Sequence, residues 1–273
     1  MSTATNKSRA RAVVLPATTY ESRIRELNAN IRKVTRANKA PSTTSYPISI
    51  GDFVAIQEDF TCPPNGRLNL YLNGQPRAVV TLSLSWSRNS GGHVHSGGLT
   101  GTVQPSSVVL GPNYPQNALT VITAPEAGGM LLIRSRFSTG PEFNQTVAVA
   151  VPGLARFAGS AEIVLTGATS SHPDNHYGLP RLNTAILKLA KAFYKQVNKR
   201  IFVNDMSLVN GGLFDIGGSW TPPHKTHRDG RRVDINSTSM TANEKAFFQT
   251  AAKAAGFSVV ILEAAPEHWH LEV

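Results

Sequence analysis

The chain has 273 residues, of which 41% are hydrophobic, and a formal net charge of +10 at pH 7. This apolar share is enough to build a folded core, which excludes wholesale disorder. The sequence contains no apolar run of the ~18 residues that a transmembrane helix needs. Its single cysteine, Cys62, excludes an intrachain disulfide and a cysteine-rich metal site.

Residues 1–47 are predicted to be a basic N-terminal extension. Residues 1–39 hold nine of the 27 basic residues but only two of the 17 acidic ones. Apolar residues recur at three- and four-residue steps within 18–38, which predicts one amphipathic helix, and the composition of 39–47 indicates a linker. We expect this predicted helix to pack on a neighbouring domain or a second copy of the chain. The alternative is that it binds an anionic wall polymer or lipid. Tyr20 is the only aromatic residue within the basic stretch 1–39, which argues against nucleic acid as the partner.

Residues 48–158 are predicted to form an all-β sandwich. Short β-rich runs alternate with clusters of Gly, Pro, Asn and Ser, and long helical patterns are missing. This spacing resembles bacterial immunoglobulin-like modules. The predicted strands lie within residues 48–56, 67–73, 78–86, 119–124, 129–137 and 146–151.

The same region contains the segment GGHVHSGG, with His93 and His95 two residues apart. On a strand both side chains face one way, so a metal site is conceivable. No carboxylate and no third histidine lies nearby in the sequence. A solvated Gly-rich loop is therefore the favoured interpretation.

Residues 159–273 are predicted to form a small α+β domain on an antiparallel sheet. Its second helix begins with a capping box, because Glu244 follows Thr241 by three residues, and it ends at Gly256. Residues 170–180 are expected to be a loop. The other predicted elements are a helix at 181–198 and strands at 200–208, 231–237, 257–263 and 268–273.

Four of the eight histidines lie between residues 224 and 270. His227 and Asp234 are separated by Gly230, which permits a turn that lets both side chains converge. In the segment HWH, strand alternation places His268 and His270 on one face. A catalytic zinc takes three His or carboxylate ligands and keeps a fourth position for water, which it makes acidic. A nearby base must accept the proton of that water.

The motifs H-x-x-G-x-x-V-D and H-W-H together resemble the zinc peptidases of the lysostaphin, D-alanyl-D-alanine peptidase and murein endopeptidase superfamily, closest to the penicillin-insensitive murein endopeptidases. The resemblance covers roughly residues 160–273. It implies that His227, Asp234 and His270 bind Zn²⁺ and that His268 is the catalytic base. The segment Glu267–His270 also fits E-x-W-H, a pattern in which Glu267 is the base. Strand parity favours His268, because Glu267 should face away.

Further residues near these motifs are candidates for substrate binding. His176 and Tyr177 could line a cleft, although capping roles in a turn are an equal alternative. Trp220 could form a cleft wall or pack in the core, and Arg228 could pair with a substrate carboxylate or lie on a solvated face. His172 could also line the cleft or belong to the turn. His224 is expected to be a solvated loop residue, with a place behind the zinc ligands as the alternative.

The sequence thus predicts a zinc-dependent peptidase that hydrolyses peptide bonds of peptidoglycan stems or cross-links. The alternative is a non-catalytic cell-wall or surface binding protein that uses the β-sandwich. Either function places the site of action in the cell envelope or outside the cell. The N-terminal residues nevertheless lack the apolar stretch of a secretory signal.

Overall fold

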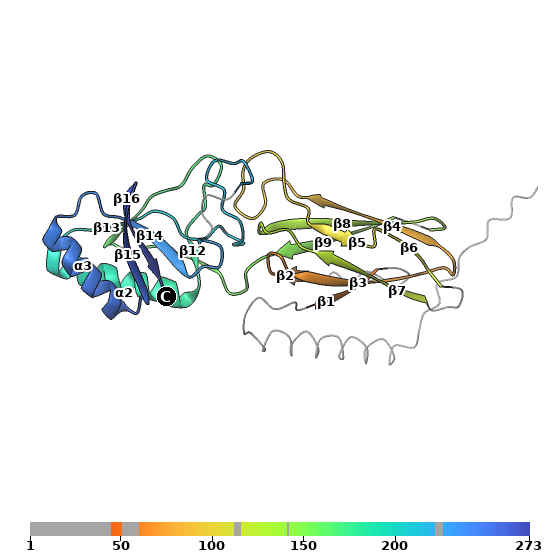
Figure 1. The fold of residues 1–273 in the computed structure, drawn as a ribbon, viewed down its shortest axis with the longest axis horizontal. Helices are drawn as coiled ribbons and strands as arrows, with labels where there is room; N and C mark the ends of the chain where they lie inside the picture. Colours follow the sequence, from red (N-terminus) through yellow and green to blue (C-terminus); the bar gives the residue numbers. More distant parts are fainter. Residues whose placement is uncertain (1–44, 51–59, 112–115, 141, 222–225) are drawn as a thin grey trace, which may run out of the picture.

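A computed structural model of the chain describes residues 45–50, 60–111, 116–140, 142–221 and 226–273. It shows a β-rich multidomain fold with two separate hydrophobic cores (Figure 1). The predicted helix at 18–38 and His224 lie outside the described residues. The predicted linker at 39–47 overlaps strand β1, which begins at Ser45.

The N-terminal module, residues 45–149, consists of two sheets that face each other (Figure 1). The first has the order β1-β3-β7-β5, with β1 (Ser45–Ile50), β3 (Arg67–Gly74), β7 (Gln116–Thr123) and β5 (Thr102–Gln104). The second has the order β2-β9-β8-β4-β6, with β2 (Phe60–Cys62), β9 (Glu142–Val149), β8 (Gly129–Phe137), β4 (Val79–Trp86) and β6 (Ser107–Val109).

Alternation of side chains builds the core of this module. Along β4, Val80 and Leu82 are buried while Val79 and Thr81 are exposed, as the period of two requires. The core combines residues of both sheets, for example Leu70 of β3 with Val80. The predicted sandwich layout is therefore present, and the immunoglobulin-like relationship stays a prediction. The short strands β2, β5 and β6 were not foreseen.

The C-terminal module contains a five-stranded sheet and two helices among its described residues. The sheet has the order β11-β13-β14-β16-β15, with β11 (Ile163–Leu165), β13 (Ile201–Val203), β14 (Arg232–Asn236), β16 (Glu267–Glu272) and β15 (Val259–Ala264). Three of its strand pairs are antiparallel, as predicted, but β11 pairs with β13 in parallel. A two-stranded sheet of β10 (Ala155–Arg156) and β12 (Tyr177–Gly178) lies before the first helix.

Helices α2 (Pro180–Val197) and α3 (Ala242–Ala255) share one core with this sheet. The predicted capping box is confirmed, because the Thr241 side chain accepts from the Glu244 backbone and the Glu244 side chain accepts from the Thr241 backbone. Gly256 closes the helix with a φ of 107°, as predicted. Neither of these two helices combines the length and the apolarity needed to span a bilayer.

Hydrogen bonds and ion pairs join the two modules. The backbone N–H of Val151 donates to the carbonyl of Asn210 at 2.9 Å, and that of Gly128 donates to Gly211 at 3.1 Å. Arg228 pairs with Glu126 at 2.8 Å. Described residues of the long segment between β13 and β14 (204–221 and 226–231) therefore contact the sandwich directly.

The thiol of Cys62 offers a test of the sandwich core. Its residue is 1% exposed, and burial raises the pKa of the thiol to about 12. We expect a thiol reagent at pH 8 to label the native chain far more slowly than the chain in denaturant, because only the thiolate reacts. Equal labelling rates in the two states would contradict this packing.

Candidate metal centres

The first centre, here called the sheet cluster, consists of His227, Asp234 and His270. Asp234 of β14 and His270 of β16 are direct partners across the antiparallel pair. Their neighbours Val233, Trp269 and others point into the core shared with the helices. Because side chains alternate along a strand, Asp234 and His270 must point to the opposite face.

His227 reaches the same face from the loop that precedes β14. Its backbone carbonyl accepts a hydrogen bond from the Ser207 hydroxyl at 2.8 Å. Gly230 has a φ of 74°, and a Cβ there would lie 2.1 Å from Leu154 Cδ2. The turn that brings His227 back toward Asp234 therefore requires glycine, as the sequence predicted.

The donor atoms of the sheet cluster lie close together. Asp234 Oδ2 is 3.1 Å from His227 Nε2, and Asp234 Oδ1 is 2.8 Å from His270 Nδ1. Burial by itself would raise the pKa of Asp234, but hydrogen bonds with His227 and His270 outweigh burial and lower the pKa. The hydrogen bond with Asp234 raises the pKa of His270. The carboxylate is therefore ionised and faced by two imidazoles, an arrangement that a divalent cation fits.

His268 lies beside this cluster. Its Nε2 is 3.5 Å from Asp234 Oδ2 and 3.4 Å from Glu263 Oε2. Its Nδ1 is 2.6 Å from the carbonyl of Pro266. A carbonyl can only accept, so Nδ1 carries a proton, and Nε2 is the ring nitrogen that can take up or release one. Glu263 faces His268 from β15 as its strand partner, and the sequence analysis did not single it out.

Glu267 points away from the sheet cluster. Its carboxylate accepts from Lys245 Nζ at 2.8 Å and from the Ser237 hydroxyl at 3.0 Å. The bond from Lys245 lowers the pKa of Glu267. The argument from strand parity therefore holds in the structure: Glu267 turns toward α3, and His268 turns toward Asp234.

The second centre, here called the interdomain cluster, consists of His93, His95, His172 and Asp215. His93 and His95 come from the loop after β4 in the sandwich, His172 from the loop before β12, and Asp215 from the long segment before β14. The prediction of a solvated loop at residues 91–98 is wrong for these histidines, since His93 is 1% exposed. The other module supplies the third histidine, His172, and the carboxylate, Asp215, which the sequence near His93 and His95 lacks.

All three imidazoles of the interdomain cluster face one carboxylate oxygen. Asp215 Oδ1 is 3.2 Å from His93 Nδ1, 3.5 Å from His95 Nε2 and 3.0 Å from His172 Nε2. Burial lowers the pKa of His93 to about 4 and lowers that of His172 as well. Three imidazoles and a carboxylate within this distance could hold a metal ion.

Aromatic rings enclose the interdomain cluster. Trp220 stacks on His93 with ring centroids 4.7 Å apart and lies 4.6 Å from His95. Phe214 meets His172 edge-on at 5.3 Å. A Cβ on Gly97 would lie 2.6 Å from Trp220 Nε1, so the glycines of this loop permit close packing rather than flexibility.

The four predicted substrate-binding residues make contacts within the protein. His176 is buried, and its Nε2 is 3.3 Å from the Val203 carbonyl. The Tyr177 hydroxyl donates to Asp174 at 3.2 Å. Trp220 belongs to the wall of the interdomain cluster, and Arg228 is engaged with Glu126 of the other module. These contacts give each of the four residues a partner within the protein, and their roles in substrate binding stay predictions.

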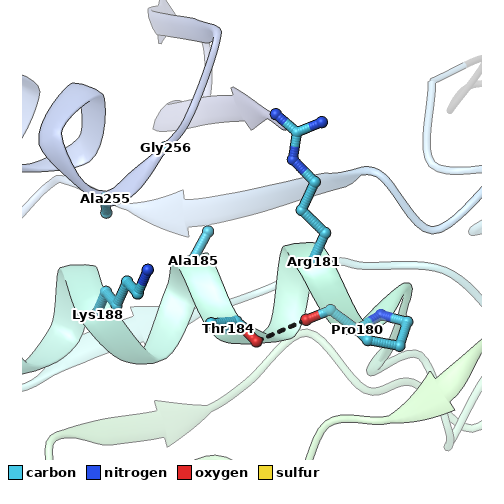
Figure 2. Close-up of a pocket in the computed structure, with 7 residues that line it drawn as sticks. All are labelled: Pro180, Arg181, Thr184, Ala185, Lys188, Ala255 and Gly256. Carbon is cyan, nitrogen blue, oxygen red and sulfur yellow. Dashed lines mark hydrogen bonds between the residues drawn. The ribbon is translucent and has the colours of Figure 1, made fainter.

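One surface cavity lies away from both clusters. Figure 2 shows it between the first turns of α2 and the end of α3. Its volume is about 420 Å³. Thr184 donates to the Pro180 carbonyl at its edge, at 2.8 Å. Arg181 and Lys188 also line it, while no histidine or carboxylate does. This cavity therefore offers neither metal ligands nor a general base.

No protein-family model matches this chain, and no curated protein is significantly similar to it. Functional assignment therefore depends on the geometry of the two clusters and on the motifs that form them.

Proposed function

We propose that this chain is a zinc-dependent peptidase that hydrolyses peptide bonds of peptidoglycan stems or cross-links. The observation that carries the proposal is the convergence of His227, Asp234 and His270 on one face of the sheet, with His268 beside them. The peptidoglycan substrate rests on the resemblance of the two motifs to murein endopeptidases.

The donors of the sheet cluster suit a catalytic zinc site. Two imidazole nitrogens and one carboxylate leave a fourth coordination position free, which is the pattern of catalytic rather than structural zinc. Zinc in such a site makes water acidic enough to attack near neutral pH and polarises a substrate carbonyl. Asp234 is ionised by its two histidine partners, so the chain supplies the negative charge that favours a divalent cation.

His268 is the proposed general base. Its Nδ1–H is held by the Pro266 carbonyl, so its Nε2 is the nitrogen that can accept a proton. Glu263, 3.4 Å from Nε2, stabilises the imidazolium that results. The same ring can then return the proton to the departing amine. Glu267 is a poor candidate for this role, because Lys245 and Ser237 occupy its carboxylate.

Removing a proposed ligand tests the metal site. We expect His227→Ala to lose one equivalent of zinc per chain and to reduce hydrolysis of purified peptidoglycan to the background rate, since two donors hold zinc weakly. Zinc is measured by elemental analysis and hydrolysis by mass spectrometry of released muropeptides. An unchanged thermal unfolding midpoint would show that the variant is folded. Full retention of both zinc and activity by His227→Ala would refute the proposal.

Two isosteric or near-isosteric variants separate the candidate bases. We expect His268→Gln to lower kcat by about 10²–10⁴-fold, the usual contribution of a general base, with zinc content unchanged. Glu267→Gln should keep kcat within a few-fold of the native value, although losing the pair with Lys245 can lower stability. The opposite pattern of kcat would transfer the role to Glu267.

A further inference from the structure

We propose that the interdomain cluster is a closed structural zinc site that fastens the N-terminal sandwich to the C-terminal module. This second site stands on residues that the peptidase motifs do not include. Its argument does not depend on the peptidase proposal, because the four side chains are distinct from those of the sheet cluster.

The distances match a tetrahedron of zinc ligands. With Zn–N and Zn–O bonds of roughly 2.0–2.1 Å, the edges of a regular tetrahedron measure about 3.3 Å. Three edges join Asp215 Oδ1 to the three imidazole nitrogens, at 3.0, 3.2 and 3.5 Å. Two more join His93 Nδ1 to His95 Nε2 and to His172 Nε2, both at 3.3 Å. Five of the six edges therefore have the required length.

Hydrogen bonding alone does not account for this arrangement. The nitrogens of His93, His95 and His172 all point to one carboxylate oxygen and also face one another. If all three carried a proton there, N–H groups would face one another at 3.3 Å. Any nitrogen without a proton would instead set its lone pair against those of Asp215 Oδ1, which can only accept. A cation between the four atoms resolves both conflicts, since every lone pair then points to positive charge.

The site is closed and supported by outer contacts. His172 and Asp215 are fully buried, and the side chain of His95 is 9% exposed. The second oxygen of Asp215 accepts a hydrogen bond from the Trp220 backbone, which orients the carboxylate. Four protein donors under an aromatic cover leave no position for water or substrate. This donor number and closure characterise structural zinc, and imidazole with carboxylate suits zinc among the common metals.

The site joins three loops at the junction of the modules (Figure 1). Val94 N–H donates to the Ser171 carbonyl at 2.8 Å, and Trp220 Nε1–H donates to the Ser96 carbonyl at 2.8 Å. Asp215 and Trp220 belong to the same long segment that carries His227 toward the sheet cluster. A zinc ion at the interdomain cluster would therefore hold both the module junction and the start of the catalytic loop.

Zinc counting on paired variants tests the proposal. We expect two zinc ions per native chain by elemental analysis after dialysis. The double variants His93→Ala/His172→Ala and His227→Ala/His270→Ala should each retain one. His176→Ala is the matched control, because it removes a buried histidine of the same module outside both clusters, and it should retain two.

Hydrogen exchange tests whether a zinc ion at the interdomain cluster holds the two modules together. In His93→Ala/His172→Ala, peptides covering residues 91–98 and 208–221 should exchange at least about tenfold faster than in the native chain, because the module junction opens locally. The same peptides should be unaffected in His227→Ala/His270→Ala. Unchanged exchange in His93→Ala/His172→Ala would refute the proposal that this site holds the modules together.

The outcomes keep the two proposals distinct. If His93→Ala/His172→Ala does not fold, the zinc count of His227→Ala/His270→Ala decides: one zinc supports the interdomain site, and none overturns it. The interdomain site is also overturned if the native chain binds one zinc ion and His227→Ala/His270→Ala loses it. It is overturned as well if the only metal found at the interdomain cluster is not zinc. A native chain with two zinc ions but no peptidase activity would refute only the proposed function.

Discussion

The alternation of side chains along β14 and β16 is the constraint on which the sheet cluster depends. Trp269 is buried and stacks on Phe248 of α3, with ring centroids 5.3 Å apart. Burial of this tryptophan fixes the face that His268 and His270 take, since a shift by one residue would exchange the two faces. The hydrophobic core thus orients the polar site, and Asp234 meets His270 because the strands pair in that register.

The two metal centres differ in the way that their proposed roles require. The sheet cluster has three donors and a neighbouring imidazole, which suits the proposed role of admitting a substrate and moving a proton. The interdomain cluster has four donors beneath Trp220, so it can only hold the chain together. The segment between β13 and β14 contributes to both, with Asp215 in one and His227 in the other. Docking of the modules and shaping of the catalytic face are therefore linked through one stretch of backbone.

Local patterns predicted much of the fold. The capping box of Thr241 and Glu244, the end of α3 at Gly256 and the long strands of the sandwich all depend on neighbours within a few residues. Short elements such as β11 were missed, because three residues give too little periodicity to recognise. The parallel pairing of β11 with β13 is likewise a property of the whole sheet and has no local signal.

The sequence by itself predicted two local pairs within the sheet cluster: a turn at Gly230 joins His227 to Asp234, and a strand period joins His268 to His270. Their union in one zinc site was implied by the resemblance to zinc peptidases, and in the structure the pairing of β14 with β16 brings Asp234 to His270. Only the tertiary structure decided the interdomain cluster. His172 lies 79 residues from His93 and 43 from Asp215, so no turn or strand period relates them. Their convergence follows from the packing of one module on the other. The same GGHVHSGG segment that suggests a solvated loop when isolated becomes half of a buried site once that surface is covered.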